Sequence, residues 1–183
     1  PSYIPRLHQI YAHNPAQIRS YIYGEFSNFR SGDVFGQYVE SRNVIPDVEA
    51  DPMRDINICF DFNASPLTWT AWQKVPYRIG ATSRLREICI AESSLKLTDL
   101  FQACVEIGQA FPSSVFADTK INIWGDRTGH AKSHKAKGTD FDNIKKYLVE
   151  LYRDVEIKAP TQITPIRASV DVLNRMFLYE LIL

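Results

Sequence analysis

Residues 56–73 read INICFDFNASPLTWTAWQ, in which an apolar run surrounds one carboxylate, Asp61. A short polar break that contains Ser65 and Pro66 separates this run from a second β-rich run. The pattern predicts a buried strand over 57–63, a turn, and a neighbouring strand over 67–73. A charge inside a core strand costs free energy unless it has a partner, and a metal ion is a common partner for a carboxylate. Asp61 is therefore the first candidate site residue.

Two further acids occupy comparable positions. Asp126 closes an apolar run that begins at Ile121, and Asp171 lies in an apolar helical pattern near the end of the chain. Three carboxylates far apart in sequence, at strand ends and on a helix, suggest a two-metal site that cleaves phosphodiesters. Oxygen ligands favour Mg²⁺ or Mn²⁺ over zinc. Glu92 follows the run 88–91 and is a fourth candidate, either as a ligand or as a group that orients a metal-bound water.

Each of these acids also has an ordinary structural interpretation. Asp61 can cap the turn that follows its strand, and a Gly-Asp pair such as the one at Asp126 is common in turns. Asp171 can lie on the solvated face of its helix. Glu92 can be a charge at a helix N-terminus, where it is favourable to the helix dipole.

The segment 129–138 holds a cluster of basic residues without a carboxylate. It follows Asp126 directly, so we expect it to lie over the same strand ends. Its lysines and the neighbouring arginine can bind phosphates without reading base sequence; they are Lys132, Lys135, Lys137 and Arg127. His130 and His134 are open alternatives as a metal ligand or proton shuttle. A solvated loop is the other interpretation of this segment.

Composition limits the class of protein. The 183 residues carry 21 basic and 21 acidic side chains, so the formal net charge is zero. This argues against a globally basic DNA-coating protein but leaves room for a local basic surface. The three cysteines lack the CxxC spacing, which favours free buried thiols in a reducing compartment. Transmembrane runs, Walker-type loops, GxSxG elbows and GxGxxG turns are all absent from the sequence.

The order of the expected elements indicates an α/β protein with a mixed central sheet and helices on both of its faces. A lead-in segment over 1–50, ending in a linker, precedes a compact domain over 51–183. Expected strands cover 34–39, 57–63, 67–73, 77–81, 87–91, 120–124 and 155–158, and expected helices cover 14–24, 98–110, 141–152 and 166–177.

In these motifs the chain resembles the C-terminal nuclease region of the large terminase subunit of tailed bacteriophages, the motor protein that packages DNA. Short motifs carry the resemblance in the right order over most of the chain. They are Tyr21–Phe26 with Ser31–Phe35, Phe60–Thr68, Ile90–Glu92 with Leu97–Asp99, Trp124–Gly129 with Thr139–Asp140, and Ser169–Asn174.

The resemblance implies a ribonuclease H-like fold and a Mg²⁺- or Mn²⁺-dependent endonuclease that cuts concatemeric viral DNA. It implies that the metal-binding acids are Asp61, Asp126 and Asp171. Our hypothesis is that Asp61 bridges two metal ions and that Asp126 and Asp171 each bind one of them. Relatives often have an Asp-Arg pair where this chain has Ala168 and Ser169, which leaves Asp171 as the acid of the last helix.

The resemblance also sets expectations about the wider context. The chain begins at Pro1 rather than Met, as a fragment that follows a missing ATPase domain would. We expect it to cut double-stranded DNA without ATPase activity, in the host cytoplasm, with the portal and the small terminase subunit as partners of the full protein and with no membrane.

Two rival functions fit the same sequence features. The first is a Holliday-junction resolvase or recombinase-like nuclease on the same fold, which would prefer branched DNA. The second is a non-catalytic module for DNA binding or docking, whose acids only cap turns.

Overall fold

The structure is a computed structural model. It describes residues 35–46, 48–62, 67–79, 81–93, 99–130, 138–160 and 166–179, with isolated positions 4, 5, 8, 9, 12, 18, 22 and 23. The chain forms two compact units, Pro1–Ile45 with Thr164–Leu183, and Pro46–Ile163. We call them unit 1 and unit 2 and describe each by itself.

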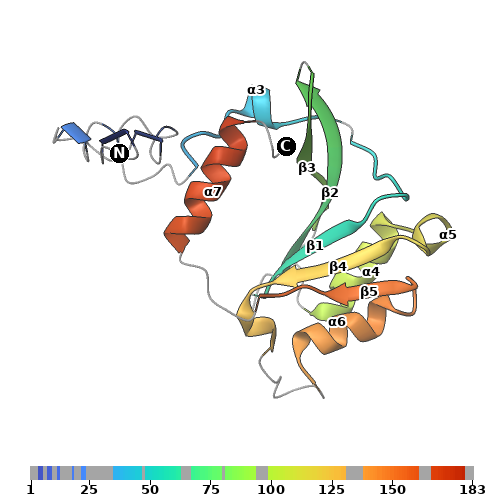
Figure 1. The fold of residues 1–183 in the computed structure, drawn as a ribbon. Coiled ribbons are helices and arrows are strands. Elements are labelled where there is room, and N and C mark those ends of the chain that lie inside the picture. Colours follow the sequence, from blue (N-terminus) through green and yellow to red (C-terminus); the bar gives the residue numbers. More distant parts are fainter. Residues whose placement is uncertain are drawn as a thin grey trace. The chain divides into compact units, whose positions relative to one another are not determined.

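Unit 2 is built on a five-stranded mixed sheet with the order β3-β2-β1-β4-β5 (Figure 1). β1 is antiparallel to β2, β2 is antiparallel to β3, and β1, β4 and β5 run parallel. This arrangement agrees with a ribonuclease H-like α/β fold and confirms the expected fold class. The strands are β1 Ile56–Asp61, β2 Thr68–Ile79, β3 Thr82–Glu92, β4 Lys120–Gly125 and β5 Asp154–Ile157.

The described helices of unit 2 pack on one face of this sheet, and the expected helices on the other face stay a prediction. The residues of β1 alternate, with Ile56, Ile58 and Phe60 buried beneath the helices and the residues between them on the opposite side. We call that opposite side, which carries Asn57, Cys59 and Asp61 of β1, the second face. The helices are α4 Leu100–Ala110, α5 Ser113–Phe116, the 3₁₀ helix η1 Arg127–His130 and α6 Asp140–Leu148.

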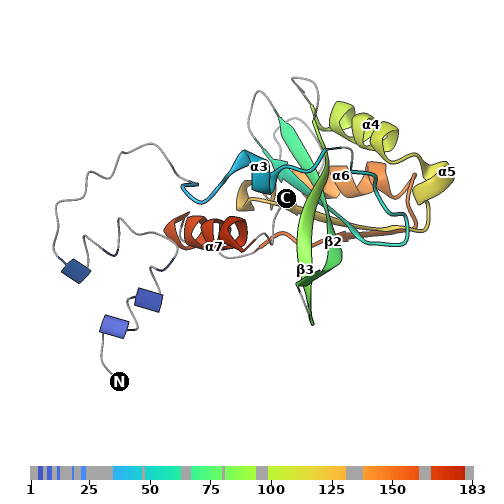
Figure 2. The ribbon, with the colours of Figure 1, turned by 90° about the horizontal axis from the view of Figure 1, so that it is seen from above.

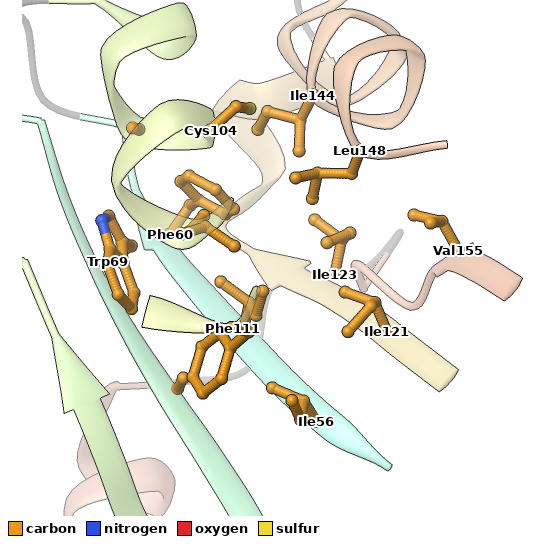
Figure 3. Packing of buried hydrophobic residues seen from close by; sticks show 14 of the residues in the cluster. Ile56, Phe60, Trp69, Cys104, Phe111, Ile121, Ile123, Ile144, Leu148 and Val155 are labelled. Carbon is orange, nitrogen blue, oxygen red and sulfur yellow. The ribbon is translucent and has the colours of Figure 1, made fainter. Parts of the chain in front are cut away.

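Figure 3 shows the core between these helices and the sheet. Aliphatic and aromatic side chains from both layers meet there, including Ile121 and Ile123 of β4 and Ile144 and Leu148 of α6. Their apolar area, once removed from water, is the main favourable term in folding. The expected apolar stripe of α6 is confirmed at Ile144 and Leu148, which are fully buried.

The two long helices of unit 2 begin at polar caps. The Asp99 side chain accepts a hydrogen bond of 2.8 Å from the backbone N–H of Gln102. Thr139 and Asp142 form a reciprocal capping box at the start of α6. The backbone N–H and the hydroxyl of Thr139 hold the pKa of the Asp142 carboxyl below its ordinary value. These caps satisfy donors that the first helical turn leaves unpaired.

β2 differs from its sequence expectation. Two separate runs were expected at 67–73 and 77–81, but one strand continues through Pro76. β1 pairs only with the first part of β2, up to Trp72, whereas β3 pairs with it as far as Ile79. Proline cannot donate to a ladder, and it is tolerated where a strand has an open side. Beyond Trp72 only one side of β2 pairs within the sheet, so Pro76 does not interrupt the strand.

Unit 1 contains α3 Glu40–Asn43 and α7 Ile166–Leu178. The backbone N–H of Gln37 donates to Asn174 Oδ1 at 3.2 Å, and Asn43 Nδ2 donates to the carbonyl of Phe177 at 3.1 Å. The Phe177 ring also contacts the ring of Tyr38, with centroids 5.5 Å apart. The segment before the linker is therefore attached to α7.

Two other expectations concern this unit. The expected strand over 34–39 is wrong, because residues 35–37 form a turn that the Tyr38 N–H closes on the Phe35 carbonyl at 3.0 Å. The expected helix over 14–24 lies outside the described residues except at positions 18, 22 and 23. The expected division of the chain into 1–50 and 51–183 stays a prediction. Within the described ranges, every helix is too short or too polar to cross a membrane.

The three cysteines are free thiols. The burial of Cys104 predicts that the protein loses stability at alkaline pH. Burial raises the pKa of Cys104 from 9.0 to about 12. Between these two pH values the unfolded thiol ionises while the native thiol keeps its proton, so the native state binds more protons. The free energy of unfolding therefore falls as the pH rises, by about 1.4 kcal/mol per pH unit.

Replacing this thiol tests the effect. Cys104→Ala should flatten the decline between pH 9 and pH 10 by about 1 kcal/mol, as measured by urea denaturation across that range. The variant is compared with the wild type at each pH, because the lost side-chain volume lowers stability by a pH-independent amount. Equal slopes for the two proteins would contradict a buried, protonated thiol.

Candidate metal centre

Two of the acids singled out by the sequence are neighbours at one edge of the sheet. In the parallel ladder of β1 and β4, Phe60 pairs with Gly125. Asp61 and Asp126 are the next residues along the chain after this pair, and both are exposed. Adjacent strands lie about 4.8 Å apart, so this register places the two acids side by side.

The backbone after β4 fixes the direction of the Asp126 side chain. Its Oδ1 accepts hydrogen bonds from the Thr128 N–H, at 2.8 Å, and from the Thr128 hydroxyl. Its own carbonyl accepts from the Gly129 N–H at 3.3 Å. The sequence allowed either a turn or a site at this position. The structure shows the turn, which orients the Asp126 carboxylate at the end of β4, and the role of Asp126 as a site residue stays a prediction.

Aromatic packing supports the two strand ends from the helix side. The rings of Phe60 and Phe62 are stacked with centroids 5.7 Å apart, and the Phe62 ring meets the edge of Phe141 at 5.0 Å. A Cβ atom built at Gly125 would lie 2.6 Å from the Phe62 ring, and one at Gly129 would lie 2.6 Å from the Phe141 ring. Contacts this short are not tolerated, so both positions require glycine for β1, β4 and η1 to approach this closely.

Glu92 is the last residue of β3 and is exposed. It pairs with Thr70, which in turn pairs with Cys59. Directly paired residues share a face of a sheet, so Glu92 lies on the second face, about 10 Å from β1 across two strand spacings. Burial raises the pKa of the nearby Cys89 thiol, and the charge of Glu92 adds to this effect. Glu92 therefore ends a strand, and the interpretation as a helix N-terminal charge is wrong.

The remaining candidates have separate outcomes. Asp171 is half-buried on α7 in unit 1, and its convergence with the two acids of unit 2 stays a prediction. Arg127 is exposed on η1, beside Asp126. The ring of His130 lies 4.8 Å from that of Phe141, against the aromatic packing under the site. Lys132, His134, Lys135 and Lys137 lie outside the described residues.

A shallow groove on the second face was not predicted from the sequence. Its floor contains Asn122, which is 5% exposed, and its Oδ1 has no hydrogen-bond partner among the described groups. Both the Asn122 amide, at 3.3 Å, and the Trp124 indole N–H, at 3.1 Å, donate to Asn57 Oδ1. No sequence motif marks these residues, because only strand pairing brings them together. The groove is lined by Met53, Arg54, Asp55, Asn57, Lys74, Asn122, Trp124 and Lys158.

The donor set at the strand ends suits a hard divalent cation. Asp61 and Asp126 offer carboxylate oxygens, which are the ligands that Mg²⁺ and Mn²⁺ prefer. Within the ranges that the structure describes, no group of three or more His, Cys, Asp or Glu side chains is close enough to hold a metal ion. The described part of the centre is thus a pair of carboxylates.

Comparison of the sequence with known proteins does not identify a family for this chain. No family model matches the sequence of the chain, and no curated protein sequence matches it significantly.

Proposed function

We propose that this chain is the metal-dependent endonuclease domain of a phage DNA-packaging terminase, cutting concatemeric double-stranded DNA with little sequence preference. The observation that carries the proposal is the parallel register of β1 and β4, which sets Asp61 beside Asp126 at one edge of the sheet. Strand ends of α/β sheets are where sites collect. A divalent cation bound between these two adjacent carboxylates would be attracted by both of them.

In this proposal each residue has a defined role. Asp61 and Asp126 would bind Mg²⁺ or Mn²⁺, and Asp171 would be the third ligand, from α7. Two such ions, when bound, supply an activated water and stabilise the leaving 3′ oxygen of the broken phosphodiester bond. Thr128 holds Asp126 in position through two hydrogen bonds to Oδ1. Glu92 lies two strands away and would orient groups at the edge of the site rather than bind metal directly.

Phosphate contacts would come from the basic residues after β4. Arg127 is exposed next to Asp126, and the lysines at 132, 135 and 137 follow it in sequence. Such contacts hold the DNA backbone without reading bases, so we expect cutting that is largely independent of sequence and weakened by salt. The portal and the small terminase subunit would be partners of the full protein.

A cleavage assay with the full chain tests the proposal. Supercoiled plasmid is incubated with Mn²⁺, with Mg²⁺, with Ca²⁺ or with EDTA, and nicked and linear products are measured over time. We expect products with Mn²⁺ or Mg²⁺ and none with EDTA. Absence of cleavage in every metal, together with no heat of Mn²⁺ binding at millimolar concentration, would favour a non-catalytic module. Faster cutting of a four-way junction than of linear duplex would favour a resolvase.

A further inference from the structure

The β2–β3 ribbon extends past the other strands of unit 2 (Figures 1 and 2). It also carries a concentrated positive charge. Residues 74–87 include four basic side chains and one carboxylate, Glu87. Glu87 pairs with Lys74 at 3.5 Å, at the base of the ribbon. The segment between them contains Arg78, Arg84 and Arg86 and no acidic residue. The rest of the chain must be net negative, because the whole chain is neutral.

Strand pairing arranges these arginines along the ribbon. Tyr77 pairs with Arg84, and Val75 pairs with Arg86, so all four side chains share one face of the ribbon. The guanidinium carbon of Arg86 lies 4.0 Å from the centre of the Tyr77 ring. This cation–π contact holds the guanidinium over the ring while leaving its charge intact. Arg78 pairs with Ser83 and lies on the other face of the same ribbon.

The charge of the ribbon contrasts with that of four other cations of unit 2. Arg54, Lys120, Arg153 and Lys158 all form ion pairs with carboxylates. In the part of the chain that the structure describes, Arg78 and Arg84 are exposed and form no salt bridge. Their field is therefore not cancelled by a neighbouring carboxylate, and an external anion is the natural partner.

We propose that the β2–β3 ribbon binds the phosphate backbone of double-stranded DNA through Arg78, Arg84 and Arg86. Guanidinium groups bind phosphates through two parallel hydrogen bonds, which favours arginine over lysine for this task. A two-stranded ribbon is also narrow enough to enter the major groove of B-DNA. This proposal rests on the proposed function only for the choice of DNA as the anion.

The position of the ribbon gives it a role separate from the metal centre. Arg84 precedes Glu92 by eight positions on β3, a distance of about 26 Å along the strand. One strand of DNA covers that distance in about eight nucleotides. The ribbon therefore holds the duplex away from the point of cleavage. It should raise affinity for long DNA without taking part in the chemistry.

Binding measurements without cleavage test this role. The affinity of the full chain for a fluorescent 30-base-pair duplex is measured by anisotropy in Ca²⁺ and in EDTA, at several salt concentrations. We expect Arg84→Gln with Arg86→Gln to weaken binding about tenfold or more near 0.1 M salt, and to lower the slope of log Kd against log salt by about two. Arg78→Gln with Arg84→Gln should behave alike, and it leaves the contact of Arg86 with Tyr77 intact.

The matched control removes the same charge elsewhere in unit 2. Lys146→Gln with Arg153→Gln lowers the net charge by two at exposed positions of α6 and of the segment before β5. We expect its affinity to stay within about twofold of the wild type. Equal losses for control and ribbon variants would overturn the proposal, because they would show an effect of net charge alone. Unchanged DNA affinity with lost binding to phosphatidylserine vesicles would overturn it in favour of a membrane surface.

The test of DNA binding by the ribbon does not depend on whether the chain cleaves DNA. Binding is measured where no cleavage occurs, so the ribbon can be confirmed even if the chain cuts no DNA. If the chain does cut, the ribbon variants should raise the KM for plasmid while kcat stays within about twofold. Normal binding by the ribbon variants would overturn the inference and leave the nuclease proposal standing.

Discussion

Asp61→Asn should abolish plasmid cleavage, lowering the rate by about a thousandfold or more, while the protein stays folded. The amide has nearly the same shape as the carboxylate but lacks the charge that attracts a divalent cation. Asp61 is the exposed last residue of β1, so the substitution should change the free energy of unfolding by less than about 1 kcal/mol. Cleavage is measured with Mn²⁺ on supercoiled plasmid, and folding is checked by circular dichroism and urea denaturation.

The matched control is an acid at the other edge of the same sheet. Asp154→Asn changes the exposed first residue of β5, which lies 3.7 Å from Lys120. β5 runs parallel to β4, so its first residue lies at the N-terminal ends of the parallel strands. The candidate metal centre lies at their C-terminal ends. This variant should cut DNA at the wild-type rate. If Asp61→Asn nicks plasmid at a near-normal rate with Mn²⁺, Asp61 is not a metal ligand.

Phe141→Ala should be the most destabilising single change near the site. Phe141 is 1% exposed and packs against Phe62 on one side and His130 on the other. Removing a buried phenyl ring costs about 3–5 kcal/mol through lost apolar burial and the cavity left behind. Whole domains are stable by only about 5–15 kcal/mol, so this loss is a large fraction. Urea denaturation of the full chain, followed by circular dichroism, measures it.

The same substitution should also affect the site. Phe141 and Phe62 form the wall that Gly125 and Gly129 approach, and this wall supports the turn that carries Asp126. Cleavage is measured at a temperature where most of the variant is folded. Its rate should fall by a larger factor than the fraction of folded protein. The control is Phe101→Ala, because Phe101 is 57% exposed on α4 and, among the described residues, its ring contacts one other aromatic ring, that of Tyr147.

We expect the control to cost about 1 kcal/mol and to leave cleavage unchanged. An equal loss in the free energy of unfolding for the two variants would contradict the packing described for Phe141. A stable Phe141→Ala variant with full cleavage would show that the aromatic wall does not position Asp126.

Much of unit 2 could be predicted from local patterns. The bounds of β1 and β4 follow from apolar runs with a clear end, and the expected and observed strands differ by at most two residues at either end. α7 begins at the expected residue and ends one residue later. The expected strand over 34–39 is wrong because an alternating pattern that short does not specify which partner, if any, a segment pairs with. Beside α7 the same residues form a turn instead.

Local patterns were enough to predict that Asp61 and Asp126 each close a buried strand, because strand ends are local features of apolar runs and glycine. The folded chain was needed to show that the two strands are parallel neighbours in register, and that the arginines of β3 share a face with Tyr77 of β2. Pairing between strands is a non-local choice, made by hydrogen bonds and by the burial of one face of the sheet under α4 and α6, and a local pattern of residues does not contain it.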